Sequence, residues 1–184
     1  MWRLANAAKI NVPQAYGIRK KGKEDMNITI LAVGKVKETF YRQAVDEFKK
    51  RLGRYCRLNI IEVQDEKTPD KAGGSLECQI KEKEALRLLK HIKETDYVVT
   101  LEIDGEQPDS AALSRKLERL GVEGTSSITF VIGGSLGLHD TVTRRSDYRL
   151  SFSNMTFPHQ LMRIILLEQI YRSYRIMNGE PYHK

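Results

Sequence analysis

The chain has 184 residues, of which 40% are hydrophobic and 30% charged, so it can bury one core or at most two small ones. No apolar run approaches the ~20 residues that cross a bilayer. The two cysteines, Cys56 and Cys78, lack the paired spacing of a disulfide framework or a metal site. Composition therefore disfavours membrane and disulfide-rich secreted proteins. We expect a soluble, cytoplasmic protein that needs no metal.

The first 25 residues differ from the rest of the chain. They hold six Lys or Arg against two acidic residues, so +4 of the +7 net charge lies there. They lack the continuous apolar segment of a secretory signal. Because Met26 directly precedes a strand-like run, we interpret residues 1–25 as a tag or a mis-assigned start, and we expect a single domain over residues 26–184. The remaining basic excess is compatible with a polyanionic partner, but many proteins without one are equally basic.

Strand-like and helical patterns alternate from Met26 onward. Short apolar runs predict strands at residues 28–33, 58–63, 97–103, 128–132 and around 148–152, with a turn at Asp104-Gly105. Apolar residues at helical spacing predict helices at residues 39–52, 76–92, from Asp109 or Ser110 to 120, near 140–145 and 158–177. Residues 64–75 are charged and rich in glycine, which indicates a mobile loop. This alternation predicts an α/β fold with a mainly parallel sheet.

A glycine-rich segment, Gly133-Gly134-Ser135-Leu136-Gly137, directly follows the most apolar strand. Ligands of open α/β sheets bind beyond the carboxyl ends of strands, and glycine lets the backbone approach a ligand closely. The segment matches neither the dinucleotide fingerprint nor a P-loop. A ligand-binding loop and a tight turn after a core strand therefore remain equally consistent with it.

A mixed apolar and polar segment precedes the last helix. Its residues are Phe152, Ser153, Asn154, Met155, Thr156 and Phe157, followed by Pro158-His159. Its backbone groups could bind the edge of an adenine, with the apolar side chains covering the ring faces. The alternative is a plain connection in which Pro158 starts the helix, and this interpretation is favoured when the segment is taken alone.

The last helix is apolar on nearly all sides, so all of its sides must be buried. In a small domain this predicts a partner subunit on one face. Glu168 and Arg172 are four residues apart, and an ion pair within the helix is the simplest account of them. The chain ends Pro181-Tyr182-His183-Lys184, and a disordered tail is the default expectation. An imidazole can nevertheless titrate near neutral pH, and a tyrosine can stack on a base.

These motifs are weak one by one, but their order is specific. A strand ending Leu101-Glu102-Ile103-Asp104-Gly105 is followed by Gly133-Gly134-Ser135-Leu136-Gly137-Leu138, then Ser153-Asn154-Met155-Thr156-Phe157-Pro158-His159, Glu168-Gln169-Ile170-Tyr171-Arg172 and a terminal Pro-Tyr-His-Lys. This order resembles the ribosomal large subunit (23S) rRNA (pseudouridine-N3) methyltransferase family of the SPOUT superfamily, over Met26 to Lys184. The resemblance implies a homodimeric α/β SPOUT fold with a mainly parallel sheet, helices on both faces and a C-terminal trefoil knot, a rare exception to the usual rules of chain connection.

The resemblance also implies a cofactor and a substrate. S-adenosyl-L-methionine is expected among three knot loops, and the contacts carried over by motif are Leu101, Gly133, Phe152, Ser153, Asn154, Met155, Thr156 and Phe157. The implied substrate is a pseudouridine of 23S rRNA within the assembled 70S ribosome. The chain shows no separate RNA-binding domain, which fits a substrate recognised through ribosome shape and phosphate charge.

Methylation at N3 of a pseudouridine requires loss of a proton, so a positioned base would help. His159 is one candidate base. Tyr182 and His183 are others, if the tail folds over the cofactor, including the cofactor of a neighbouring subunit. Arg172 or Lys184 could offset negative charge that develops on the base, with Glu168 orienting them. Which residue acts as the base stays open at this point.

Two other classes of function remain to be weighed. A non-catalytic ribosome-binding module could use the same fold, but the presence of the full set of expected cofactor contacts argues against it. A nucleotide enzyme of the Rossmann type is disfavoured because the glycine motif lies late in the chain and lacks the fingerprint spacing.

Overall fold

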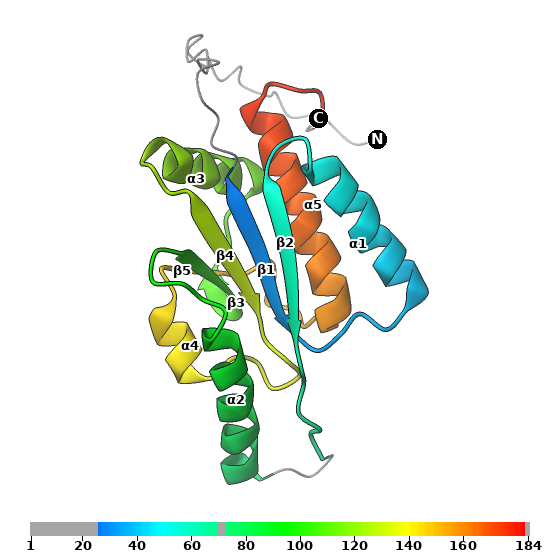
Figure 1. Cartoon of the computed structure of the whole chain (residues 1–184), viewed down its shortest axis with the longest axis vertical. Coiled ribbons are helices and arrows are strands. Elements are labelled where there is room, and N and C mark those ends of the chain that lie inside the picture. Colours follow the sequence, from blue (N-terminus) through cyan, green and yellow to red (C-terminus); the bar gives the residue numbers. More distant parts are fainter. Residues whose placement is uncertain (1–25, 70–72, 183–184) are drawn as a thin grey trace, which may run out of the picture.

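The computed structural model describes residues 26–69 and 73–182, and within them strands and helices alternate as predicted (Figure 1). The strands are β1 (Asn27–Val33), β2 (Arg57–Val63), β3 (Tyr97–Glu106), β4 (Ser127–Ile132) and β5 (Tyr148–Leu150). The helices are α1 (Thr39–Leu52), α2 (Gly74–Leu89), α3 (Ser110–Val122), α4 (Asp140–Arg145) and α5 (His159–Met177). The expectations for residues 1–25 and for His183 and Lys184 lie outside the described residues.

The strands form one sheet in the order β2-β1-β4-β3-β5, and every neighbouring pair is parallel. This confirms the predicted mainly parallel sheet. Because all strands run the same way, their carboxyl ends meet at one edge of the sheet, toward the lower end of Figure 1. Among the helices of residues 26–69 and 73–182, none has the length and apolar character needed to cross a membrane.

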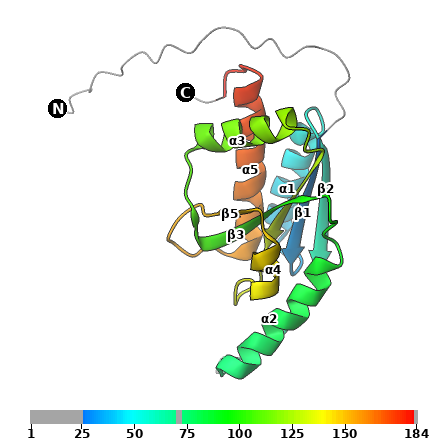
Figure 2. The same cartoon turned by 90° about the vertical axis from the view of Figure 1, so that its left-hand side faces the viewer.

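Helices cover both faces of the sheet. Alternate side chains of a strand point to opposite faces, which separates the apolar residues of β1 into two groups. Ile28, Ile30 and Ala32 pack with buried residues of α1, α3 and α5 in the larger core. Leu31 and Val33 pack with residues of α2 and α4 in a smaller one. Both views place α2 at the end of the molecule opposite the C-terminal end of α5 (Figures 1 and 2).

Several local predictions hold at the level of single residues. Asp109 caps α3, since its carboxylate accepts a hydrogen bond from the backbone N–H of Ala112 at 2.6 Å. His139 caps α4 by accepting from the N–H of Thr141 at 3.3 Å. Pro158 directly precedes the first residue of α5.

The turn predicted at Asp104-Gly105 is wrong, because β3 continues through it to Glu106. The strand makes an irregular excursion there, in which both Leu101 and Glu106 pair with Leu150 of β5. Gly105 lies against that strand so closely that a Cβ atom on it would be 2.7 Å from the carbonyl carbon of Leu150. Because Gly105 has no Cβ atom, β3 and β5 can approach each other closely here, and the glycine does not form a turn.

The start of α5 is tied to the sheet by a buried arginine. Arg163 is 1% exposed, and its Nη2 donates to the carbonyl oxygens of Val33 at 2.9 Å and Gly34 at 2.6 Å. Its Nη1 donates to Glu62 Oε1 at 2.5 Å. Burial lowers the pKa of Arg163, and the Glu62 carboxylate opposes that shift. One side chain of α5 thus satisfies groups at the ends of two strands.

Replacing Arg163 with methionine is expected to lower the free energy of unfolding by about 2–4 kcal/mol, because it leaves two carbonyl groups and a carboxylate without their donor. Urea denaturation measures this change. The matched control is Arg119→Met, which breaks an exposed pair with Glu123 at the end of α3 and should change the free energy of unfolding far less. Equal losses in the two variants would contradict the proposed anchoring.

Candidate functional site

The connections that follow β3, β4 and β5 lie at the carboxyl edge of the sheet. β3 pairs with both β4 and β5, so the three connections are neighbours. The predicted cofactor contacts lie there: Leu101 in β3, Gly133 directly after β4, and residues 152–157 between β5 and α5. The fold therefore brings the three predicted segments together, as ligand sites of open α/β sheets require.

The glycine-rich segment after β4 is a tight loop. A Cβ atom on Gly133 would lie 2.8 Å from the carbonyl carbon of Gly137. Gly137 has a φ of +80°, which strains any other residue, and its N–H donates to the carbonyl of Gly134 at 3.1 Å. Gly133 is half-buried. The backbone here is both shaped by glycine and partly open, which fits close approach by a nucleoside.

The segment 152–157 is held by hydrogen bonds at its polar residues. The N–H of Met155 donates to Ser153 Oγ at 2.9 Å, and Gln107 Nε2 donates to Asn154 Oδ1 at 2.6 Å. Phe152 packs against the larger core, whereas Met155 is 70% exposed. The exposed thioether of Met155 offers an apolar surface that a flat ligand can cover.

Glu84 of α2 is a candidate functional residue that the sequence analysis did not identify. It is only 4% exposed, and its Oε1 accepts from the N–H of Glu66 at 2.9 Å. A Cβ atom on Gly134 would lie 2.9 Å from its Oε2, so Glu84 packs beneath the glycine-rich loop. Burial raises the pKa of Glu84. The sequence offered one indication that Glu84 is buried. Glu84 lies four residues before Leu88 and therefore on the same, buried side of α2.

His159 lies at the start of α5, but against the end of β1. Gly34 follows β1 with a φ of +81°, and a Cβ atom there would be 3.0 Å from His159 Cε1. Burial, and then the nearby charge of Arg163, lowers the pKa of His159, so its imidazole is neutral at neutral pH. A general base must be unprotonated before it can accept a proton, and a neutral imidazole meets this condition. The role of His159 as the base stays a prediction.

The other predicted catalytic residues described by the structure gather near the C-terminal end of α5. Arg172 forms an ion pair with Glu168, as their spacing predicted. Tyr182 Oη donates to Glu168 Oε1 at 3.3 Å, and the Arg172 guanidinium lies 4.8 Å from the centre of the Tyr182 ring. We call Glu168, Arg172 and Tyr182 the tail cluster.

The tail is ordered through Tyr182, contrary to the default expectation of disorder. The ring of Tyr182 packs edge-on against Tyr171 at 5.1 Å between ring centres. Glu180 accepts a hydrogen bond from Tyr55 Oη at 2.7 Å and pairs with Arg175. Aromatic contacts and charge pairs thus outweigh the fraying that is usual at a chain end.

The tail cluster lies far from the carboxyl edge of the sheet, where the predicted cofactor contacts are; we call this edge the cofactor edge. α5 rises 1.5 Å per residue, so Arg172 is about 20 Å along the helix from His159. Figure 1 shows the start of α5 near the carboxyl ends of β1 and β2 and its C-terminal end at the top. Within one chain, the predicted cofactor contacts and the tail cluster therefore lie near opposite ends of the same helix.

Glu84→Gln is expected to stabilise the protein at neutral pH. The pKa of Glu84 is raised by folding, so the cost of burying its charge is absent below its unfolded pKa and appears as pH rises through the folded value. The melting temperature of the variant should match that of the wild type near pH 4 and exceed it near pH 8. The control is Glu82→Gln, an exposed residue of the same helix, which should leave the pH dependence unchanged. A constant difference at every pH would contradict the assignment.

Comparison with known proteins gives a consistent result. Residues 26–183 match the family model described as "Predicted SPOUT methyltransferase". Proteins named ribosomal RNA large subunit methyltransferase H from Clostridium kluyveri and Clostridium tetani are each 60% identical to this chain over 159 residues, covering 86% of it and 100% of their own length. One from Bifidobacterium adolescentis is 58% identical with the same coverage. The resemblance drawn from the order of motifs is thereby confirmed, and the chain belongs to the SPOUT methyltransferase family.

Proposed function

We propose that this protein methylates N3 of a pseudouridine in 23S rRNA on the assembled 70S ribosome, with S-adenosyl-L-methionine as the methyl donor. Relatives at about 60% identity that are named for large-subunit rRNA methylation support the substrate class. The observation that carries the proposal is the tight loop of residues 133–137, which we call the glycine cradle. It follows β4 at the same edge of the sheet as the two other predicted cofactor segments. An rRNA substrate also supports a cytoplasmic location.

The part of the site that would bind the methyl donor, which we call the donor half, consists mainly of backbone N–H and C=O groups. Gly133 lets the loop after β4 fold back tightly on Gly137, which fixes its half-buried backbone groups in place. Residues 152–157 offer N–H and C=O groups to an adenine edge. When bound, S-adenosyl-L-methionine supplies an electrophilic methyl group. The protein's contribution is then to hold donor and acceptor in line and to exclude water, which accounts for much of the rate enhancement in such transfers.

The acceptor half of the site is the tail cluster. Arg172 carries the positive charge that would offset negative charge on a deprotonated pseudouridine, and Glu168 holds it in place. Burial, and then the Glu168 carboxylate, raises the pKa of Tyr182. Tyr182 therefore stays protonated at neutral pH and suits a hydrogen-bond donor better than a base. This leaves His183 and His159 as the candidate bases.

A second copy of the chain would join the two halves. Leu161, Ile165, Glu168 and Arg172 follow one another at helical spacing and are only partly buried. Such an aliphatic stripe beside the tail cluster is typical of a homodimer interface, which is more apolar than ordinary surface. We infer a homodimer in which the tail cluster of one copy faces the donor half of the other.

The expected trefoil knot has local support in the contact between β3 and β5. The N–H of Ser151 donates to the carbonyl of Glu106 at 2.8 Å, while Leu101 and Glu106 both pair with Leu150. The excursion of β3 therefore closes around the strand that leads into α5. We infer that the chain after β5 passes through this excursion before α5 packs against α1 and α3.

Mass-spectrometric mapping of 23S rRNA tests the proposal directly. Ribosomes from cells that lack the protein should carry an unmethylated pseudouridine, and the purified protein with S-adenosyl-L-methionine should restore the methyl group. Unmodified rRNA after such treatment, together with no calorimetric binding of the donor, would favour a non-catalytic ribosome-binding module.

Gly133→Ala is expected to abolish calorimetric binding of S-adenosylhomocysteine, because the new Cβ must displace the backbone at Gly137. The control is Gly73→Ala at the start of α2, where a Cβ atom meets nothing within 4 Å. Donor binding that survives Gly133→Ala with wild-type affinity would place the donor elsewhere.

A mixture of two inactive variants tests the composite site. Gly133→Ala removes the donor half and Arg172→Ala the acceptor half, so each homodimer should be inactive. Equal amounts, denatured and refolded together, should recover about a quarter of wild-type activity, because random pairing makes half of the dimers mixed, with one intact site in each. No recovery in the mixture would indicate that each site is built within one chain.

A further inference from the structure

The sheet face covered by α2 and α4 changes character along its strands. Toward the carboxyl ends it is apolar, with Leu31, Val33 and Val63 buried against α2 and α4. Toward the amino ends the same face is polar. Polar residues lie side by side there on three neighbouring strands. They are Arg57 and Asn59 in β2, Asn27 and Thr29 in β1, and Ser127 and Thr129 in β4. Parallel sheets are normally covered on both faces, so a polar half that is open at Asn27 and Asn59 is unusual, although Thr129 in β4 is buried.

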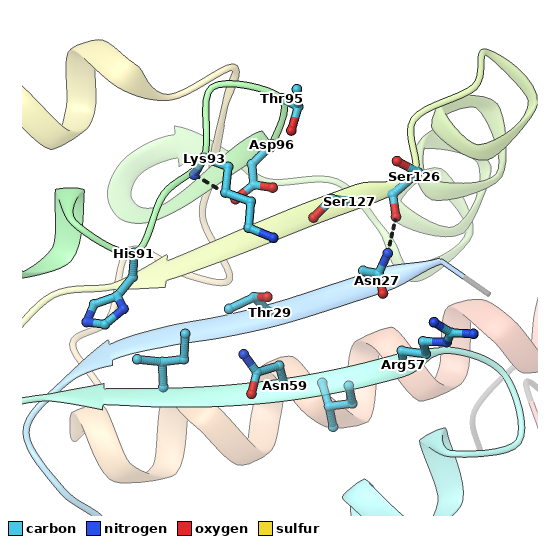
Figure 3. A pocket seen from close by; sticks show the side chains of 12 residues that line it. Asn27, Thr29, Arg57, Asn59, His91, Lys93, Thr95, Asp96, Ser126 and Ser127 are labelled. Atoms are coloured by element: carbon cyan, nitrogen blue, oxygen red, sulfur yellow. Dashed lines mark hydrogen bonds between the residues drawn. The ribbon is translucent and has the colours of Figure 1, made fainter. Parts of the chain in front are cut away.

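This polar half forms the floor of a pocket of about 400 Å³ (Figure 3). Its walls come from the connection between α2 and β3, which contributes His91, Lys93 and Thr95, and from Ser126 before β4. Figure 3 shows the side chains of Thr29 and Asn59 on the floor, with Lys93 reaching over the sheet. The pocket is remote from the donor half of the site, because it lies at the opposite ends of the strands.

The charge in the pocket favours an anionic partner. The cationic residues Arg57 and Lys93 are exposed at its rim. Asp96 is the one acidic residue among those that line it, and it is 6% exposed. Its Oδ2 accepts hydrogen bonds from Thr129 Oγ1 at 2.9 Å and from the N–H of Lys93 at 3.1 Å. Asp96 therefore fixes the wall that carries Lys93, while the cations face outward.

We propose that this pocket binds the sugar–phosphate backbone of ribosomal RNA, as a second contact apart from the methyl-transfer site. Arg57 and Lys93 suit phosphate oxygens, since both are cations with several N–H donors. Thr29 and Asn59 can each donate and accept, as recognition of a ribose 2′-hydroxyl requires. The inference rests on the proposed function, because it takes rRNA as the substrate.

A second copy of the chain fits this surface less well than RNA. Homodimer interfaces have apolar cores, and charged residues are depleted there. The lining of the pocket is instead mostly amide, hydroxyl and charged groups, with Leu58 and Ile61 as its aliphatic members. The partly buried aliphatic residues Leu161 and Ile165 lie on α5, which packs on the opposite face of the sheet. Contacts to phosphate and sugar make up most hydrogen bonds of protein–nucleic acid interfaces.

The position of the pocket determines what it can affect. β1 spans seven residues, so Asn27 lies about 20 Å from the carboxyl edge where the donor is expected. A phosphate bound at this distance cannot take part in the chemical step. The pocket therefore contributes to ribosome affinity and orientation, and its loss should raise KM and leave kcat unchanged.

The double variant Arg57→Gln/Lys93→Gln tests this in the full-length protein, since both side chains are exposed and folding should be preserved. Ribosome binding should weaken about tenfold, and the slope of log affinity against log salt should fall by roughly 1.5. KM for ribosomes should rise to match at unchanged kcat. Calorimetric affinity for S-adenosylhomocysteine should equal that of the wild type.

The matched control is Lys49→Gln/Lys50→Gln on α1, which removes the same charge from exposed positions on the other side of the sheet. Wild-type affinity and salt slope in the pocket variant, or equal losses in the control, would overturn the proposal. So would dissociation of dimers by the pocket variant in light scattering, which would identify a second copy as the occupant. Failure of the proposed function is a separate result, namely wild-type protein that binds ribosomes without methylating them.

Discussion

The buried guanidinium of Arg163 joins the last helix to the sheet, and the rest of the site depends on this junction. It bonds to Val33 and Gly34 at the end of β1 and to Glu62 of β2. The segment 152–157 is thereby fixed at both ends, by β5 paired with β3 on one side and by the anchored start of α5 on the other. A loop held in this way can present backbone groups to a ligand without first being ordered, which lowers the entropic cost of binding.

Helix α5 also separates the predicted cofactor contacts from the tail cluster. Under the proposed function, a single chain could not bring Arg172 to the donor without a large rearrangement, because the two groups of residues lie near opposite ends of the helix. Symmetry offers a simpler solution, because a two-fold axis that places one α5 beside another puts each end near the opposite end of its partner. The partly buried stripe of Leu161 and Ile165 lies where such a contact would form.

The parallel sheet divides the remaining surface by function. Its carboxyl edge carries the glycine cradle and the other two predicted cofactor segments. Its amino-terminal half, on the face of α2, carries polar residues such as Thr29 and Asn59. Under the proposed function, surfaces of this kind would hold a large ribonucleoprotein substrate. Recognition and chemistry would then occupy opposite ends of the same strands.

The sequence alone determined the alternation of elements, the parallel sheet and the positions of Gly133 and residues 152–157 directly after strands, whereas Leu101 lies within β3. These features follow from local periodicity and from the rule that parallel strands end at one edge. Tertiary structure decided the rest. Gly105 is locally typical of a turn, but contact with Leu150 makes it part of a strand. Glu84 is polar yet buried beneath the glycine-rich loop, and Tyr182 is held by Tyr171 and Glu168. Such contacts join residues distant in sequence, and no local pattern encodes which distant groups will meet.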